Sequence, residues 1–274
     1  MSVLLISDDA VKDHIGNVLT QRPRGGFEQL SLSQFLWRCG VRVNSQGRLV
    51  IDATDPMSMT IIDRVVEISS TTVSAVGGAS ALLHRGQVYS AYEQLLCKET
   101  SHRKSTQYTL LGRLLPLTTQ WLLVNRALPQ IGIPEFRSGY GPERVQAKGL
   151  TDPIFKSPFD LYSWRPNERP DEVVWDDFIV SRPVGRPILT YRLTDRTIIE
   201  ALDHDVSFTG HEALLEIVFP KVLELFEAAV GEALWFGTGG QLTFAAFSHS
   251  LSGAAKSERF TDEADAYLQS FVSQ

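Results

Sequence analysis

Cysteine is scarce in this sequence: Cys39 and Cys97 are the only two among 274 residues, and no Cys-x-x-Cys pair occurs. One disulfide between them is possible, but a two-cysteine chain of this length is more typical of a reduced, intracellular protein. We expect both to be small buried hydrophobic residues. Cys97 is the better candidate for a reactive thiol, because Lys98 follows it and His102 lies a little further on.

Long apolar runs are also absent. The opening run, residues 3–6, is four residues long and is soon followed by Asp8 and Asp9. A signal peptide needs a basic start and about 7–15 apolar residues, and a membrane-spanning helix needs about 20. Neither pattern occurs, so we expect a cytoplasmic protein that acts without a membrane.

Positive charge is not in excess. The sequence has 26 basic and 32 acidic side chains, which gives a formal charge of −6 and a pI near 5.6. This balance gives no overall attraction to phosphate backbones, so we expect no nucleic-acid partner. Hydrophobic residues make up 43% of the chain, which is enough apolar surface to exclude global disorder.

Short apolar segments alternate with helical patterns, which predicts an α/β (α+β) fold. Strands are predicted at 3–6, 28–32, 61–66, 121–124, 175–180 and 188–193, the last two as a pair. Glycine-containing turns predict hairpins over 41–51 and 233–247. Helices are predicted after Asp8 and Asp9, over 87–99, over 211–230 with Gly231 as C-cap, and from a cap at Thr261. Pro220 should kink the third of these or mark a break near Phe219.

Proline divides the chain into three predicted parts. Seven of the 13 prolines fall within 129–170, which excludes long helices and central strands there. We therefore expect an N-terminal α/β domain over 1–128, an ordered loop-rich excursion over 129–170, and a C-terminal sheet-and-helix domain over 171–274. The aromatic residues of the excursion either hold it against the core or form a contact surface with Arg165; they are Phe155, Phe159, Tyr162 and Trp164.

Two segments of the sequence have the residue types of a metal site or of a phosphate loop. Asp203, Asp205 and His211 form the densest group of metal-binding side chain types, although acids are also ordinary in a solvated loop. The Gly-rich segment 237–240 leads into a strand and not into a helix N-terminus, so it indicates a hairpin turn and not a phosphate loop.

Four basic residues are candidates for binding an anion or a substrate: Arg126, Arg182, Arg186 and Lys156. A guanidinium binds carboxylate or phosphate through two parallel hydrogen bonds, which favours arginine in this role. The sequence does not show whether these residues converge. No residue is assigned as catalytic, since no Gly-x-Ser-x-Gly pattern occurs.

The order of these parts resembles that of the ATP-grasp superfamily, of the kind that modifies peptides. The matching pieces are an Asn-Arg pair after an apolar run at 124–126, an Arg-Pro-Val-Gly turn within 181–187, and Val-Gly at 230–231 followed by the strand 241–247. The resemblance implies a pre-ATP-grasp-like α/β domain at the N-terminus, an ATP-dependent ligase ancestry, and ATP and Mg²⁺ as cofactors.

One part of the family pattern is missing. The family holds Mg²⁺ with carboxylates and an asparagine on the last strand pair, where this chain has Phe-Ala-Ala-Phe-Ser at 244–248. The central segment, which in the family supplies two ATP-contacting lysines, offers Lys148 and Lys156. These departures predict a pseudoenzyme of peptide or amino-acid modification that serves as a binding or partner subunit.

Two alternatives stay open. The first is an active ATP-dependent carboxylate–amine ligase with displaced ligands, supplied by Asp203, Asp205 and Glu216. The second is a non-enzymatic interaction module that uses the 129–170 aromatics. The partner in each case is a peptide, a protein or a small molecule.

Overall fold

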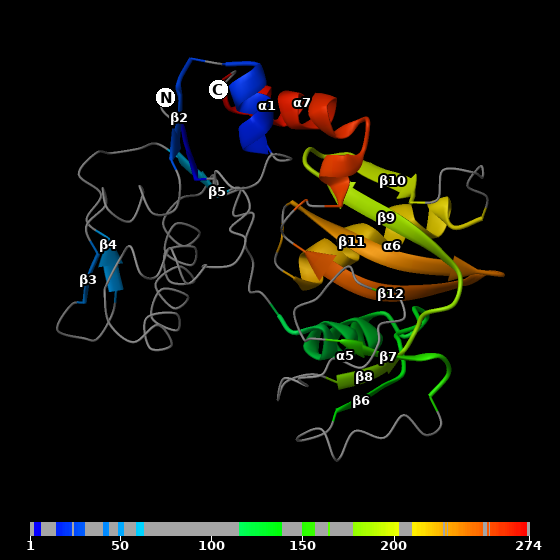
Figure 1. The fold of residues 1–274 in the computed structure, drawn as a ribbon. Helices are drawn as coiled ribbons and strands as arrows, with labels where there is room; N and C mark the ends of the chain where they lie inside the picture. The colour runs from blue at the N-terminus through cyan, green and yellow to red at the C-terminus, as the bar shows by residue number, and fades with distance from the viewer. Residues whose placement is uncertain are drawn as a thin grey trace. The chain divides into compact units, whose positions relative to one another are not determined.

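The computed structural model contains two compact units (Figure 1). It describes residues 3–6, 15–23, 25–30, 41–43, 49–51, 59–62, 115–138, 150–156, 164, 178–202, 210–226, 228, 230–248, 251 and 253–272. The first unit consists of Met1–Arg113, Ala228–Val230 and His249–Gln274, and the second of Leu114–Glu227 and Gly231–Ser248. The expected division into 1–128, 129–170 and 171–274 stays a prediction. None of the helices in the described ranges is long and apolar enough to span a membrane.

The first unit contains a small parallel sheet and a separate hairpin. Strand β1 (Val3–Ile6) pairs in parallel with both β2 (Phe27–Leu30) and β5 (Met59–Ile62). Strands β3 (Val41–Val43) and β4 (Leu49–Ile51) pair in antiparallel fashion. The predicted strand at 3–6 and the predicted hairpin over 41–51 are therefore confirmed. The predicted helix over 87–99 lies outside the described residues.

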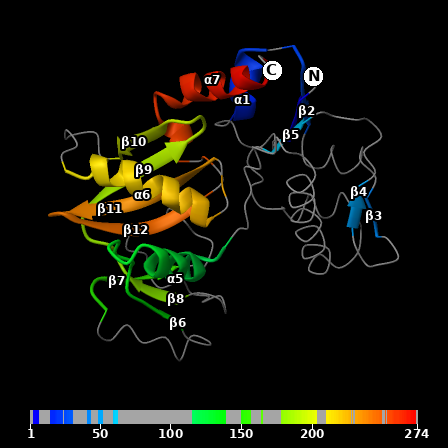
Figure 2. The same cartoon turned by 180° about the vertical axis from the view of Figure 1, so that it is seen from behind.

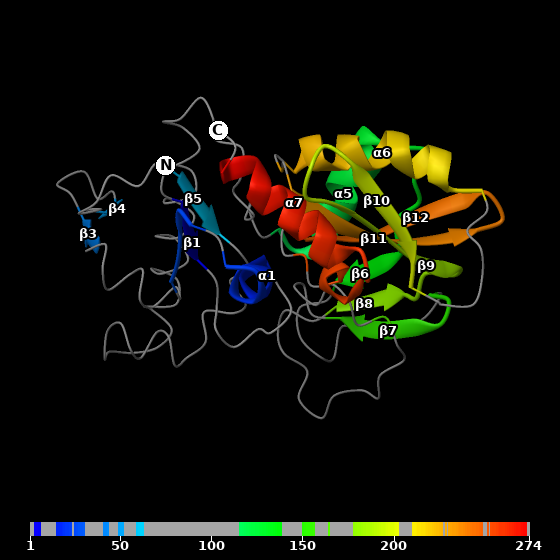
Figure 3. The ribbon, with the colours of Figure 1, turned by 90° about the horizontal axis from the view of Figure 1, so that it is seen from above.

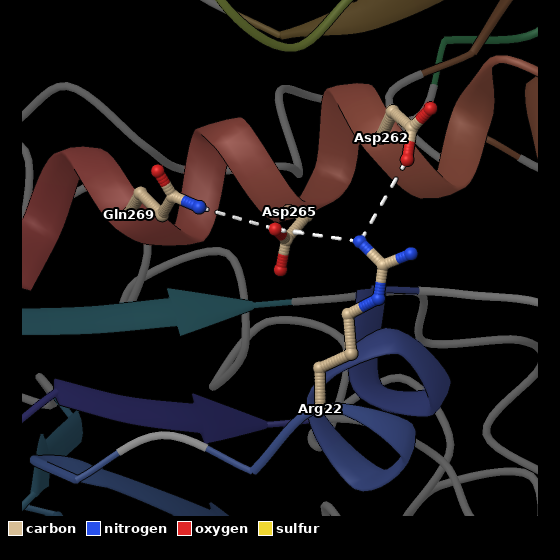
Figure 4. Close-up of polar contacts among 4 residues, drawn as sticks. All are labelled: Arg22, Asp262, Asp265 and Gln269. Atoms are coloured by element: carbon tan, nitrogen blue, oxygen red, sulfur yellow. Dashed lines mark hydrogen bonds and ion pairs between the residues drawn. The ribbon is translucent and has the colours of Figure 1, made fainter.

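Two helices pack together in the same unit, α1 (Ile15–Gln21) and α7 (Phe260–Val272), which a short 3-10 helix, η1 (Ala254–Lys256), precedes (Figure 3). Arg22 lies 3.7 Å from an oxygen of Asp262 and 3.4 Å from one of Asp265, which also accepts a hydrogen bond from Gln269 (Figure 4). The pair of Arg22 with the exposed Asp262 adds little stability, and the pair with Asp265 joins a half-exposed arginine, so we expect buried side chains to contribute most of the contact between the two helices. They include Ile15, Val18, Leu19, Ala264, Tyr267 and Leu268. Helix α7 begins one residue before Thr261, the predicted cap.

The second unit is built on a four-stranded antiparallel sheet in the order β10-β9-β11-β12. Its strands are β9 (Arg186–Arg192), β10 (Thr197–Ala201), β11 (Gly231–Thr238) and β12 (Gln241–Ser248). The predicted 233–247 hairpin is β11 and β12, and is confirmed. Helix α6 (Glu212–Leu225) lies along one face of this sheet (Figures 1 and 2).

The predicted end of α6 is wrong. Pro220 lies inside the helix without breaking it, which leaves the predicted kink as the open alternative, and the helix ends at Leu225 with Phe226 as its C-cap. Gly231 is not a helix cap but the first residue of β11. A Cβ on Gly231 would come within 2.6 Å of the Phe247 ring and 3.0 Å of the Ser248 carbonyl oxygen. The glycine is therefore needed for close strand packing and not for a left-handed turn.

A second, three-stranded sheet has the order β6-β8-β7, with strands β6 (Phe136–Ser138), β7 (Pro153–Lys156) and β8 (Phe178–Ser181). The predicted pairing of 175–180 with 188–193 is wrong, because β8 pairs with β6 and β7 whereas β9 pairs with β10 and β11. The turn after β8 carries the chain from one sheet to the other. Gly185 in this turn has a φ of 120°, and a Cβ there would lie 2.5 Å from the Gly237 carbonyl oxygen.

The predicted strand at 121–124 is part of a helix, α5 (Leu117–Ala127). Its buried residues are Leu117, Gln120, Trp121 and Val124, whereas Leu122 is 58% exposed. Burial at three- and four-residue intervals is the pattern of a helix packed on one side. The apolar run alone was too short to distinguish a strand from a helix. The Asn-Arg pair of the family resemblance therefore lies in the last turn of α5.

Candidate functional site

The outer edge of β12 is covered by groups from α5 and from the segment after it. Gly132 forms a parallel bridge with Thr243, donating to the Leu242 carbonyl and accepting from the Phe244 N–H. The Trp121 indole donates to the Ala245 carbonyl at 2.7 Å. The amide of Gln120 accepts from the Phe247 N–H at 2.7 Å and donates to the Phe247 carbonyl at 3.1 Å. The backbone of Gly132 and the side chains of Gln120 and Trp121 thus take the place of a neighbouring strand along this edge.

A β-bulge lies on β12 at Ala245. Leu234 is opposite Ala246 and Trp235 is opposite Phe244, so Ala245 is an extra residue with no partner on β11. The bulge changes which side chains share a face, because alternation restarts after it. Phe244 and Phe247 consequently lie on the same face of the sheet.

One face of the sheet, the Phe226 face, carries the aromatic rings that stack on Phe226, the C-cap residue of α6. Phe226 stacks on Phe247 with ring centroids 4.6 Å apart and on Phe244 at 6.3 Å. Trp235 meets Phe244 edge-on at 5.3 Å, and its indole donates to the Thr190 hydroxyl at 2.9 Å. All of these residues are buried, and the hydroxyl is the polar side-chain group that they enclose.

The opposite face, the Trp164 face, carries the alternate residues of β11 and β12. They are Glu232, Leu234 and Phe236 on β11, and Thr243, Ala246 and Ser248 on β12. Glu232 lies directly across from Ser248 and is 1% exposed. It supplies the single carboxylate of these two strands. The positions next to it toward the turn carry the methyl groups of Leu234 and Ala246.

A row of four aromatic rings connects the small sheet with the Trp164 face. Phe136 on β6 lies 5.2 Å from Trp121, Trp121 lies 6.1 Å from Trp164, and Trp164 lies 5.9 Å from Phe236 on β11. Trp164 is 7% exposed, so in this structure it packs against the body of the second unit. Phe159, Tyr162 and Arg165 lie outside the described residues, and the Phe155 side chain is not described.

Lys156 is the predicted anion-binding residue with the most unusual surroundings. It is the last residue of β7, is 1% exposed, and places its Nζ 4.3 Å from the centroid of the Trp164 ring. An ammonium at this distance from an indole face forms a cation–π contact. A positive charge is thus held at the junction of the two sheets.

The three predicted arginines occupy other places. Arg182 forms an ion pair with Asp152 and lies just beyond the end of the β7–β8 ladder opposite to Lys156, about 14 Å away along the strands. Arg186 begins β9 opposite Gly237 and is exposed. Arg126 is exposed in the last turn of α5. Their role in binding an anion stays a prediction.

Of the three predicted metal ligands, Asp203 and Asp205 lie outside the described residues. His211 is the N-cap residue of α6, and its ring lies so close to Gly237 that a Cβ there would come within 2.9 Å of Nε2. Over the described ranges, no group of three or more His, Cys, Asp or Glu side chains could hold a metal ion.

Glu212 follows His211 at the start of α6 and is held as a carboxylate. Hydrogen bonds from backbone N–H groups, first its own and then those of Gly210 and His211, lower the pKa of Glu212 below its ordinary value. The Gly210 N–H donates to Oε2 at 3.0 Å. Negative charge is favourable at a helix N-terminus, so this carboxylate has a sufficient structural explanation.

Two residues of the site were missed by sequence reasoning. Glu232 is an acid at the start of an otherwise apolar strand, and this exception to the pattern was the available signal. Gln120 carries no such signal, because its partner Phe247 is 127 residues away in the sequence.

Comparison with solved structures identifies the fold. The ATP-grasp ligase PsnB, in complex with a phosphomimetic variant of minimal precursor, Mg and ADP, gives a TM-score of 0.63 at 15% identity over 98% of this chain and 97% of that chain. The macrocyclase MdnC from Microcystis aeruginosa MRC, bound with precursor peptide MdnA, gives 0.59 at 10% identity over 98% and 100%. A Chryseobacterium gregarium RiPP-associated ATP-grasp ligase, in complex with ADP and a leader and core peptide, gives 0.56 at 12% identity over 98% and 97%.

Sequence comparison finds no equivalent. No family model matches the sequence, and no curated protein matches it significantly. The structural likeness extends over nearly the whole chain, and it agrees with the order of parts seen in the sequence. The protein therefore has the fold of the peptide-modifying ATP-grasp ligases.

Proposed function

We propose that this protein binds a peptide on an ATP-grasp scaffold and acts as a binding or partner subunit in peptide modification, without the usual Mg-ATP site. The observation that carries the proposal is the composition of the Trp164 face. Glu232 and Ser248 carry the side-chain oxygens at one end of this face, and the next residues on the same face, Leu234 and Ala246, are aliphatic.

This donor set does not fit Mg²⁺. The ion requires near-octahedral oxygen coordination, usually with carboxylates and substrate phosphates together. One buried carboxylate followed by Leu234 and Ala246 offers too few oxygens at the strand pair. Without the metal, the negative charge of a transferring phosphoryl group is not neutralised, which argues against ordinary ATP-dependent ligation.

A peptide is the partner that the structural neighbours support. PsnB and MdnC, which share the fold over almost their full length, were both solved with precursor peptides bound. Loss of the metal site need not affect a peptide-binding surface elsewhere on such a scaffold, because function depends on individual sites and not on the fold as a whole.

Isothermal titration calorimetry of the full chain with ADP, with and without Mg²⁺, tests the first half of the proposal. We expect no Mg²⁺-dependent binding heat. Tight binding that requires Mg²⁺ would overturn it. The second half is tested by selecting ligands from a displayed random-peptide library and measuring their affinity by fluorescence anisotropy, which we expect to be unchanged by added Mg-ADP.

A second candidate is an active ligase with displaced ligands, and Glu232 favours it. A buried carboxylate beside Ser248 is an unusual feature of a strand pair that otherwise encloses apolar groups. This candidate predicts phosphate release from ATP that is lost on Asp203→Asn with Asp205→Asn, or on Glu232→Gln, while the unfolding temperature stays nearly the same for the loop variants. Wild-type protein that releases no phosphate with any selected peptide present would exclude it.

A further inference from the structure

The sheet β10-β9-β11-β12 has two outer edges, which differ in what covers them. The edge of β12 is covered by the backbone of Gly132 and by the side chains of Gln120 and Trp121. Over the described ranges, no strand pairs with the outer edge of β10. An edge of this kind offers a row of backbone N–H and C=O groups to another strand.

The pairing of β10 with β9 shows which backbone groups face this edge. The Leu202 N–H donates to the Pro187 carbonyl just beyond the end of β10. Hydrogen-bonded and non-hydrogen-bonded pairs alternate along an antiparallel ladder, so Ile198 and Glu200 bond to β9. The other residues of β10 direct their N–H and C=O groups outward; they are Thr197, Ile199 and Ala201. None of these three residues is buried.

The sequence of β10 contains few of the features that prevent pairing between strands. It has neither proline nor glycine, and its register with β9 continues without a bulge. Its β-branched residues favour an extended backbone. It carries a negative charge, Glu200, and a positive charge, Arg196, directly precedes it. Arg196 is exposed and Glu200 is half-buried.

We propose that the outer edge of β10 is the contact between two copies of this chain, paired in antiparallel fashion about a two-fold axis at Ile198. In this register Thr197 of each copy exchanges hydrogen bonds with Ile199 of the partner subunit. Arg196 lies opposite Glu200 of the partner subunit, and the symmetry produces this pair twice. Side chains of non-hydrogen-bonded pairs are the closest across a ladder, so opposite charges there stabilise the pairing.

The positions of the charges favour a second copy as the partner, because β10 is complementary to itself. A register shifted by two residues also matches the outward groups, but it places Glu200 opposite Ile198 of the partner subunit and loses both charge pairs. The contact goes beyond the proposed function and does not depend on it.

Sedimentation velocity of the full chain over a range of concentrations tests the contact. We expect a dimer whose fraction rises with concentration. Glu200→Arg places arginine opposite arginine and should weaken dimerisation by about tenfold or more, and Arg196→Glu should act alike. The double variant exchanges the charges and should restore the wild-type affinity. Glu224→Arg, the same charge reversal at an exposed position of α6, is the matched control and should change nothing.

Thr197→Pro provides a second disrupting variant if Glu200→Arg fails to fold. It removes an outward N–H at the first residue of an edge strand, where proline is tolerated. Hydrogen exchange then tests the register in the wild type. The amides of Thr197 and Ile199 should become protected as the dimer forms, whereas that of Glu200, which bonds to β9, should be equally protected at every concentration.

Three results would overturn the proposal. The first is a wild type that stays monomeric at every soluble concentration, and the second is a dimer that survives the single charge reversals and Thr197→Pro. The third is protection of Thr197 and Ile199 that does not depend on concentration, because a segment of the same chain would then cover the edge. A folded double variant without restored affinity excludes the pairing of Arg196 with Glu200 and overturns it too. None of these results bears on peptide binding, so the proposed function is tested separately.

Discussion

The two faces of the β9–β11–β12 ladder are both buried, but they enclose different chemistry. The Phe226 face holds stacked rings and one hydroxyl, that of Thr190, which is hydrogen-bonded to Trp235. The Trp164 face holds the Glu232 carboxylate. The Trp164 ring packs against Phe236 on this face and also contacts the Lys156 ammonium.

Packing explains the residues of the Phe226 face, but it does not explain the buried charged groups on and beside the Trp164 face. Taking an ion out of water costs several kcal/mol before its contacts compensate, so charged groups are rarely enclosed without a reason. Proteins depart from local consistency mainly at functional sites. We therefore expect substitutions on the Phe226 face to change stability alone, and those around Lys156 to change binding as well.

The largest expected effect is on the Phe226 face. Trp235→Ala should lower the free energy of unfolding by about 3–5 kcal/mol, because it leaves a cavity beside Phe244 and Ile188 and removes a hydrogen bond to Thr190. Urea unfolding measures the change. Leu122→Ala, at a 58% exposed position, is the control and should change it by less than about 0.5 kcal/mol. Equal losses in the two variants would contradict the assignment of this face as core.

The edge of β12 should give the next largest effect. Gln120→Leu removes a donor and an acceptor, and leaves both backbone groups of Phe247 buried without these partners. We expect a loss of about 2–3 kcal/mol. Hydrogen exchange should also accelerate at the Phe247 amide. The same substitution at the exposed Gln269, which donates to Asp265, should cost under about 0.5 kcal/mol.

The contact between Lys156 and Trp164 should give a smaller, purely pairwise effect. A double-mutant cycle with Lys156→Met and Trp164→Ala isolates the interaction from the other contacts of each residue. We expect a coupling free energy of about 0.5–2 kcal/mol. A coupling of zero would mean that the indole lies over the ammonium without attracting it, and the two faces would then not differ in their electrostatic interactions at this contact.

The smallest effect is expected at the start of α6. The pKa of Glu212 is lowered, mainly by hydrogen bonding to its own backbone N–H, so its contribution to stability is fully present above about pH 4.5, its ordinary pKa. The contribution is lost as the pH falls through the lowered pKa. Glu212→Gln should remove this pH dependence of the unfolding midpoint. Glu224→Gln, at the other end of α6, should leave it in place.

The strands of the β11–β12 hairpin could be predicted because every signal agreed. Apolar strands of similar length flank a Gly-rich turn, in which Gly239 and Gly240 have positive φ. Helix α5 could not be predicted in this way, because one of the four residues on its buried side is the polar Gln120, which interrupts the apolar pattern of a helix. A buried glutamine is recognisable only from its partner Phe247, which a reading of local periodicity does not reach.

The candidate site was predicted in part. Lys156 was among the proposed anion-binding residues, and the absence of acids from β12 follows from the sequence. The contact of Lys156 with Trp164 could not be predicted, because the sequence favours packing of Trp164 on the core but does not show against which residue it packs. The pairing of β8 with β7 was missed for a similar reason: a Pro-Gly turn can join strands of one sheet or of two.

The extra residue at Ala245 has a consequence for anyone who compares this chain with other proteins strand by strand. Counting every second residue back from the turn would assign Ala246 and Ser248 to the side of Phe244, whereas cross-strand pairing assigns them to the side of Glu232. If β12 kept Ala245 but paired without the bulge, Phe247 would point away from Phe226, whereas deleting Ala245 would leave Phe247 on the side of Phe244. An alignment with a strand that lacks the bulge therefore needs a gap at this position, because otherwise residues of the Phe226 face are matched with residues of the Trp164 face.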